Sequence, residues 1–186
     1  MLAYLVAATA AGQEVLREGD APRPLRSAQA RLRRLSRRVG RKRKGSANRR
    51  KAAARLGRAH AHVRQVRQQF LHGVANALVK THDRIALEDL NIAGMMANHY
   101  LAGAIADAAW AELARIVRYK QQWRGGQVIG VDRWYPSTKT CSRCRTIAPT
   151  MALSTRVFRC EQCGYQADRD LNAAINLAVW AEEHHA

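Results

Sequence analysis

Acidic residues are missing from a long stretch of this 186-residue chain. No Asp or Glu occurs from Ala21 to His82, whereas Arg and Lys recur throughout that stretch. The formal net charge is +18 and the sequence pI is about 11.1. An excess of positive charge of this size indicates a polyanionic partner, and nucleic acid is the obvious one. The alternative, a basic face that serves only solubility, does not explain why the charge is concentrated in one stretch.

Cysteine is absent outside one segment, where two CxxC pairs are separated by fifteen residues. The cysteines are Cys141, Cys144, Cys160 and Cys163. This spacing is typical of a structural zinc site, with four thiolates around a tetrahedral Zn²⁺ and a small hairpin in the gap that brings the pairs together. Gly164 favours a tight turn after the second pair, whereas Arg145 makes the first turn less typical. Disulfides would suit a secreted protein, but the chain shows no secretory leader, so we expect metal binding in a reducing cytoplasm.

Long apolar runs are also lacking. The apolar start, residues 1–12, has no basic n-region and is too short to span a bilayer. Its β-branched and aromatic residues end at a Gly12–Gln13 turn that is followed by Glu14–Leu16, which predicts a β-hairpin. We therefore expect no membrane partner.

Helix and strand patterns alternate along the rest of the chain. A basic helical hairpin is expected over about 26–80, with a cationic loop at 40–46 between its helices. Strands are expected at 84–91 and 127–132, on either side of one helix over 101–123, and a closing helix from Leu171 to about Glu182. The second helix of the hairpin carries an apolar stripe at steps of three and four residues: Val63, Val66, Phe70, Val74 and Leu78. The order favours an α/β protein with a mixed sheet and an inserted four-cysteine zinc module.

Two carboxylates stand where elements begin or end. Glu88 closes the strand RIALE, and active sites of α/β sheets lie at the carboxyl ends of strands. Asp170 directly precedes the closing helix, where the structural alternative is an N-cap. Hydrolysis of a phosphodiester by two metal ions needs several carboxylates, and Mg²⁺ prefers such oxygen ligands. Glu88 and Asp170 are therefore candidate catalytic residues, with Asp89 and Asp168 as weaker ones.

The basic hairpin, roughly Arg31 to Arg58, is the candidate nucleic-acid interface. Its side chains would neutralise phosphates and release counterions, so binding should depend steeply on salt. Trp134 and Tyr135 lie in a loop before the cysteines and are the aromatic candidates for stacking on bases. The cations expected at phosphates are Arg34, Arg37, Arg38, Arg41, Lys42, Arg43, Lys44, Arg49, Arg50 and Lys51.

Several blocks in one order resemble the TnpB (OrfB) family, whose members are encoded by insertion sequences and are similar to type V CRISPR effector nucleases. The blocks are IALEDLNIAGM, VDRWYPSTKTCSRC and CEQCGYQADRDLNAAIN, preceded by the basic stretch RLRRLSRRVGRKRKGSANRRKA. The resemblance implies an RNase H-like (RuvC) nuclease domain with an inserted zinc ribbon, which cuts DNA selected by a guide RNA. It places Glu88, in the EDLN motif, and Asp170, in the DxNAA motif, among the catalytic Mg²⁺ ligands.

The resemblance also implies a division of the chain. Residues 1–140 would form a partial RuvC-like domain that includes the hairpin, 141–164 the zinc ribbon, and 165–186 the closing RuvC motif and helix. The family has a first catalytic aspartate in a GxDxG-like motif on its opening strand, and no such motif precedes Leu5 here. We therefore expect an amino-terminally truncated TnpB-type protein with impaired cleavage.

A second class of function stays open. The hairpin and the zinc ribbon could form a non-catalytic RNA- or DNA-binding module, or a regulator of a full-length relative. A ribosomal or transcription-type zinc-ribbon protein fits the basicity but does not predict EDLN or DRDLNAA. We expect DNA and a guide-type RNA as partners, and a prokaryotic cytoplasmic protein that associates with the nucleoid when bound to DNA.

Overall fold

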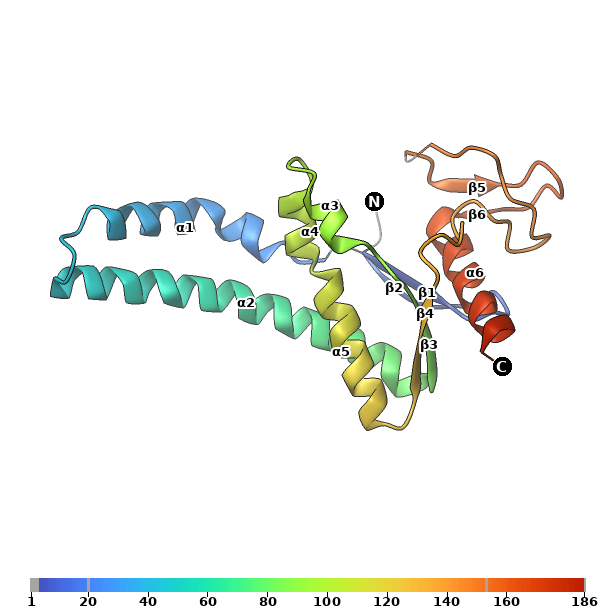
Figure 1. Ribbon diagram of the computed structural model, residues 1–186, viewed down its shortest axis with the longest axis horizontal. Helices are drawn as coiled ribbons and strands as arrows, with labels where there is room; N and C mark the ends of the chain where they lie inside the picture. Colours follow the sequence, from blue (N-terminus) through green and yellow to red (C-terminus); the bar gives the residue numbers. More distant parts are fainter. Residues whose placement is uncertain (1–3, 20, 153, 186) are drawn as a thin grey trace. The chain divides into compact units, whose positions relative to one another are not determined.

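A computed structural model describes residues 4–19, 21–152 and 154–185 (Figure 1). The chain forms two compact units. We call residues 21–73 with 92–113 the hairpin unit, and residues 1–20, 74–91 and 114–186 the sheet unit. Met1 to Ala3, at the start of the expected first strand, lie outside the described residues. Within the described ranges, no helix combines the length and the apolar character needed to cross a membrane.

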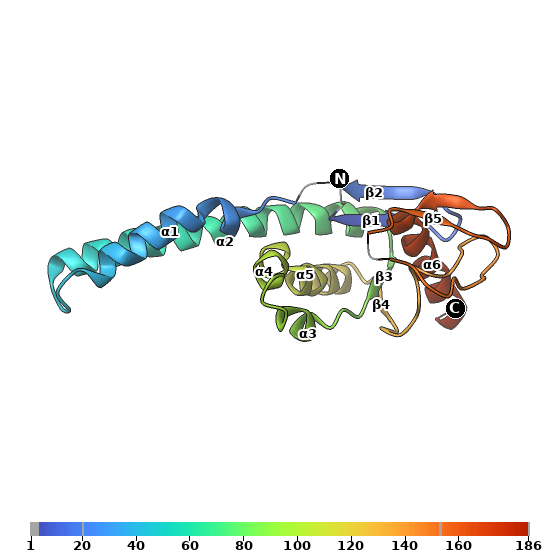
Figure 2. The same ribbon diagram turned by 90° about the horizontal axis from the view of Figure 1, so that it is seen from above.

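The hairpin unit is built on two long basic helices. Helix α1 (Pro24–Gly40) and helix α2 (Ala47–Thr81) lie side by side in both views (Figures 1 and 2). Their shared core is small, with buried Leu32, Ala59 and Val63 at its centre. Four partly buried residues pack around it: Leu25, Ala28, Leu35 and Leu56. The expected helices are confirmed, and because the apolar stripe is narrow, most of their cations stay in solvent.

An aspartate far away in sequence caps the start of α1. Asp107, 5% exposed on helix α4 (Ala102–Ala108), accepts hydrogen bonds from the backbone N–H groups of Leu25 (3.1 Å) and Arg26 (3.0 Å). It also pairs with Arg67 of α2 at 3.1 Å. The carboxylate thus satisfies two free N–H groups and a guanidinium, a role that the N-cap residue Arg23 does not perform.

Replacing Asp107 by Ala is expected to destabilise the hairpin unit by about 3–5 kcal/mol, because it leaves a partly buried guanidinium and two helix-end N–H groups without their acceptor. Urea denaturation followed by circular dichroism measures the loss. Asp89→Ala is the matched control, since Asp89 pairs with Arg133 at an exposed site and should cost less than about 1 kcal/mol. Equal losses in the two variants would contradict the tertiary cap.

The expected single helix over 101–123 is wrong. The structure has α4 and then α5 (Trp110–Trp123), and a short helix α3 (Ile92–Met96) precedes them. The break lies at Ala109, whose φ of 54° is left-handed while its N–H still bonds to Ile105 O at 3.0 Å. A left-handed alanine costs roughly 1–2 kcal/mol, and neither glycine nor proline marks the place. Burial of Ile105 and Leu113 on the two sides of the break offsets that cost.

The described part of the sheet unit holds three separate pairs of strands, one of them beside the cysteines and two packed against one helix. Strand β1 (Leu5–Ala8) is antiparallel to β2 (Glu14–Glu18), and β3 (Arg84–Glu88) is parallel to β4 (Gln127–Val131). Helix α6 (Arg169–His184) packs against β1, β3 and β4. The α/β class and the first hairpin are as expected, but the single mixed sheet is not formed, because β1–β2 and β3–β4 are not hydrogen-bonded to each other among the described residues. Buried residues of this unit include Val74, Leu78, Ile85, Ile116, Val117, Ile129, Val131 and Ile175.

A glycine fixes the turn that brings β4 beside β3. Helix α5 ends at Trp123, and Gly125, with φ of 75°, turns the chain just beyond it, as the sequence predicts. A Cβ at Gly126 would lie 2.4 Å from Gln121 Nε2 and 2.6 Å from the backbone oxygen of Asp83. Only glycine fits there without displacement, and the next residue, Gln127, donates its N–H to that same oxygen at 2.7 Å. The close approach sets the register of β3 and β4.

Candidate metal centre and carboxylate site

The four cysteines meet at one point. All four sulfur atoms lie within 4.8 Å of one another, with Cys141 Sγ 3.7 Å from Cys163 Sγ and Cys144 Sγ 3.5 Å from Cys160 Sγ. Sulfur atoms at about 2.3 Å from a tetrahedral zinc are about 3.8 Å apart, whereas a disulfide needs about 2.05 Å. The cysteines are free, and their donor set and spacing fit a four-coordinate thiolate-binding metal.

Each CxxC pair sits in a tight turn of the same shape. The N–H of Arg145 bonds to Cys141 O at 2.9 Å, and the N–H of Gly164 bonds to Cys160 O at 3.0 Å. Arg145 (φ 67°) adopts the same left-handed conformation as Gly164 (φ 70°). The spacing predicts a single hairpin in the gap between the two pairs. Instead, each cysteine pair lies at the tip of its own hairpin. Strands β5 (Val157–Arg159) and β6 (Gln166–Asp168) flank the second pair, and a Thr140–Ile147 bridge flanks the first.

The sulfur atoms differ in environment. Cys141 and Cys160 are buried with Phe158 in a small core of their own. Burial raises the pKa of Cys141, while the hydrogen bond with the Thr146 hydroxyl lowers the pKa of Cys144 to about 6. Metal binding must therefore expel a proton from at least Cys141, which makes the affinity of the cluster fall in acid.

Two fully buried asparagines of α6 hold the loop that enters the first cysteine pair. Asn172 donates to Thr140 O at 2.8 Å and accepts from the N–H of Ser142 at 3.0 Å. Asn176 donates to Ser137 O at 2.8 Å and to Thr140 O at 2.6 Å. Sequence reasoning missed this function. The available signal was two amides four residues apart in the otherwise apolar stretch 171–181, which must find partners when buried.

Glu88 lies at the carboxyl end of β3, as the sequence predicts. Its side chain is exposed, and Glu88 Oε1 accepts a hydrogen bond from Ser137 Oγ at 3.0 Å. The neighbouring carboxylate, Asp89, is already paired with Arg133, at 3.1 Å from Arg133 Nε. Of the two acids at this strand end, Glu88 is hydrogen-bonded to a serine and Asp89 is paired with an arginine.

Asp170 lies in the first turn of α6 and is not the helix cap. Asp168 performs that role, accepting from the N–H groups of Asp170 and Leu171 at 3.0 Å each. The capping alternative for Asp170 is therefore wrong, because the helix begins at Arg169, two residues earlier than expected. Asp170 is half-buried and pairs with Arg169 at 3.3 Å, and the positive end of the α6 dipole favours a carboxylate there.

The two carboxylates do not gather with a third. Among the residues that the structure describes, the four cysteines are the one group of three or more metal-ligating side chains whose donor atoms converge. Glu88 and Asp170 belong to the same unit, at the ends of β3 and at the start of α6. Glu88 and Asp170 are therefore not part of a group of three or more converging ligands among the described residues.

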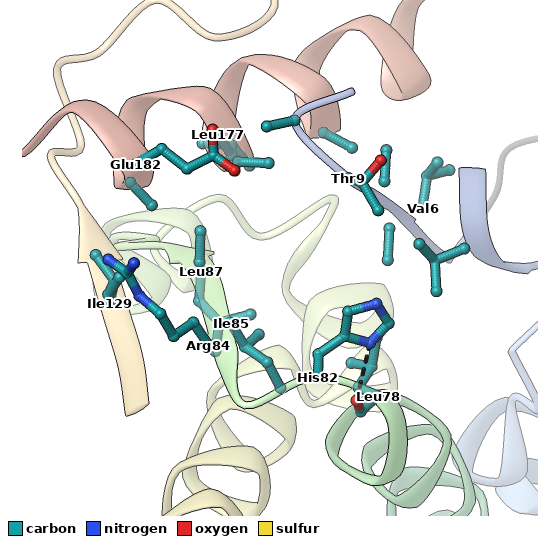
Figure 3. Close-up of a pocket in the computed structure, with 18 of the residues that line it drawn as sticks. Val6, Thr9, Leu78, His82, Arg84, Ile85, Leu87, Ile129, Leu177 and Glu182 are labelled. Carbon is teal, nitrogen blue, oxygen red and sulfur yellow. Dashed lines mark hydrogen bonds between the residues drawn. The ribbon is translucent and has the colours of Figure 1, made fainter. Parts of the chain in front are cut away.

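A cavity of about 280 Å³ lies between β1 and β3 beneath α6. Figure 3 shows Val6 on one side, Ile85 and Leu87 on the other, and Leu177 on the helix. Its lining is mainly apolar, and neither Glu88 nor Asp170 contributes to it. The cavity is therefore not the carboxylate site, but it separates the two strand pairs.

The Lys and Arg side chains of the hairpin unit are exposed, with two exceptions, Arg67 beside Asp107 and Arg49. Arg49 is half-buried, and its guanidinium donates to the carbonyl oxygens of Val39 (3.0 Å) and Lys42 (3.2 Å). It holds the end of α1 to the loop and is committed to the fold. The nine other cations expected at phosphates extend into solvent from α1, the loop and α2.

Two family models match successive parts of the chain. Residues 5–99 match the model of a transposase family, OrfB of IS605, described as a probable transposase. This chain belongs to the TnpB (OrfB) family. Residues 110–177 match a second model, the Cas12f1-like TNB domain. In this TnpB chain, Glu88 lies in the first matched region, while the four cysteines, Asp170 and the two asparagines lie in the second.

Named relatives of this TnpB chain are longer than it is. A protein of Streptomyces pristinaespiralis named "Putative RNA-guided DNA endonuclease" is 42% identical over 84% of this chain and 39% of its own length. InsQ of Escherichia coli strain K12, which bears the same name, is 35% identical over 80% of this chain and 40% of its own. A cryo-EM structure of the Cas12f1–sgRNA–target DNA complex has a chain that matches 93% of this one and 48% of itself, with a TM-score of 0.59 and 16% identity. At that identity the likeness concerns the fold.

Proposed function

We propose that this chain is the nuclease part of a TnpB-type, RNA-guided DNA endonuclease. The observation that carries the proposal is that Glu88 and Asp170, each from a different matched family region, belong to the same compact unit. In this proposal residues 1–140 and 165–186 form the RuvC-like nuclease domain. Residues 141–164 form its zinc ribbon, with Zn²⁺ as the structural metal of the four-cysteine cluster, because a closed set of four thiolates suits that ion.

The cavity supports an RNase H-like sheet. Within the described residues β1 bonds only to β2 and β3 only to β4, so each keeps one open edge, and residues of both strands line the cavity. One further strand between β1 and β3 would hydrogen-bond to the open edges of both strands. It would also cover the apolar side chains that line the cavity. The two strand pairs would then form one sheet beneath α6.

Glu88 and Asp170 would hold Mg²⁺ at the edge of this sheet. Carboxylate oxygens suit the ion, and the bound ion would activate water and neutralise charge on the phosphate. The side chains bind and orient: Glu88 is steadied by Ser137, and Asp170 is placed by the first turn of α6. Two carboxylates are fewer than a metal pair needs, so we expect the isolated 186-residue chain to cleave DNA slowly.

Glu88→Gln and Asp170→Asn are each expected to reduce any Mg²⁺- or Mn²⁺-dependent cleavage by at least about 100-fold, since even the outer partners of metal ligands are worth 10–100-fold. Gel assays on single- and double-stranded DNA, with and without co-expressed RNA, measure this. Asp89→Asn is the control, because Asp89 is the neighbouring acid engaged by Arg133. Cleavage that survives in both variants would exclude this site as the nuclease.

A second function, a non-catalytic RNA- or DNA-binding module, is favoured by the exposed cations of α1, the loop and α2. DNA and a guide-type RNA are the proposed partners in either case. Trp134, 84% exposed between β4 and the first cysteine pair, offers a face for base stacking. Wild-type chain that binds RNA tightly but cleaves nothing under any of the conditions above would favour this second function.

A further inference from the structure

A buried serine lies between the carboxylate site and the cysteine cluster. Ser137 is 3% exposed, and its hydroxyl donates to Glu88 Oε1 at 3.0 Å. The hydroxyl has one O–H to donate, and Glu88 accepts this hydrogen bond. An exposed glutamate has three side-chain torsions and samples many rotamers, so a donor fixed in the protein interior selects among them.

The serine itself is held from the opposite side. Its backbone oxygen accepts from Asn176 Nδ2 at 2.8 Å, and the same amide nitrogen reaches Thr140 O at 2.6 Å. Asn172 adds bonds to Thr140 O and to the N–H of Ser142. Both asparagines are fully buried, so their amides have no water to exchange with and their partners stay fixed.

We propose that Ser137 is a positioning residue for Glu88, and that the Asn172–Asn176 pair of α6 supplies its rigid support. One carboxylate oxygen of Glu88 is taken by the hydroxyl, and the other is directed toward solvent for a divalent cation. The arrangement ties the Glu88 ligand to α6, the helix that carries Asp170, and to the loop that enters Cys141. This inference rests on the proposed metal-binding function of Glu88.

The alternative is that Ser137 only fills space in the loop. A space-filling residue would affect stability alone, whereas a positioning residue affects the rotamer of Glu88 and the affinity for the metal through Glu88. Removing the hydroxyl by Ser137→Ala leaves a small side chain at a buried position and no enlarged cavity of consequence. Ser142→Ala is the matched control, because Ser142 contacts Asn172 through its backbone N–H.

Two measurements on the full chain test the proposal. Three-bond couplings of ¹³C-labelled glutamate should report one rotamer for Glu88 in the wild type and in Ser142→Ala, and averaged rotamers in Ser137→Ala. Calorimetric titration with Mn²⁺ should show 10–100-fold weaker binding in Ser137→Ala, as for other outer partners of metal ligands. In the Glu88→Gln background, Ser137→Ala should bring no further loss.

The outcomes are separable. An averaged Glu88 rotamer in the wild type, or an unchanged single rotamer in Ser137→Ala, overturns the positioning role. If Ser137→Ala weakens Mn²⁺ binding equally in the wild type and in the Glu88→Gln background, the positioning role is also overturned. The serine would then act independently of Glu88. If the Glu88 rotamer changes in Ser137→Ala but Glu88→Gln leaves the Mn²⁺ affinity unchanged, the positioning of the carboxylate is upheld. The proposed metal-binding function of Glu88 is then refuted.

Discussion

The purified chain is expected to contain one zinc ion, and Cys141→Ser is expected to remove it together with the folded structure of residues 140–168. Structural zinc contributes roughly 10–16 kcal/mol in zinc-finger peptides near neutral pH, which is as large as the whole stability of many domains. The core beside the sulfur atoms is small, with Phe158 as its largest buried side chain. It cannot replace the metal. Elemental analysis and amide hydrogen exchange measure the two losses.

Ser142→Ala is again the control, since it lies inside the first cysteine pair and offers no sulfur. It should keep both the zinc and the protection of nearby amides. Lowering the pH should release the ion, because protons compete for thiolates and burial already raises the pKa of Cys141. A wild-type chain without metal, or a Cys141→Ser chain that retains it, would exclude the proposed zinc site.

Nucleic-acid affinity is expected to fall by about 10³–10⁵ between 50 and 200 mM salt if six to ten phosphates are contacted. Replacing the loop cations by glutamine should weaken binding at low salt and reduce the slope of log K against log salt by about three to four. The loop cations are Arg41, Lys42, Arg43 and Lys44, all exposed. Fluorescence anisotropy with a single-stranded DNA and a structured RNA, across that salt range, measures both quantities.

The control removes the same charge from the sheet unit. It replaces by glutamine the four exposed arginines Arg118, Arg124, Arg156 and Arg159. If net charge alone governs binding, the two variants will lose affinity equally, and the hairpin is then not the contact surface. Arg49→Gln serves a different purpose: its guanidinium binds backbone oxygens, so its main effect should be on the thermal stability of the hairpin.

Features set by neighbours in sequence could be predicted, and features set by distant residues could not. The cysteine spacing predicts the cluster because each CxxC pair is a local turn, and the period of Val63, Val74 and Leu78 predicts the buried face of α2. The cap supplied by Asp107 depends on a contact spanning 82 residues. No residue near Pro24 in the sequence indicates this cap, and no residue near Ala109 indicates the helix break.

The acidic turn before α6 illustrates the same limit at short range. Its two aspartates, Asp168 and Asp170, are equally good caps by residue type. The choice is made by strand β6, which runs directly into the helix and whose last residue pairs with Val157 of β5. The N–H of Arg169 then bonds to Arg156 O at 2.8 Å. Because the sheet fixes Asp168 as the cap, the carboxylate of Asp170 does not cap the helix and pairs with Arg169 instead.

The buried asparagines of α6 also bear on the order in which the molecule assembles. The cysteines that face each other are at most 22 positions apart, whereas Asn176 reaches back 39 positions to Ser137. Short loops close faster than long ones, and α6 follows Cys163 along the chain. The cysteine cluster can therefore close before Asn176 anchors the backbone of Ser137. A folding chain would then bring the four cysteines together first, and the serine that bonds to Glu88 would be anchored only afterwards.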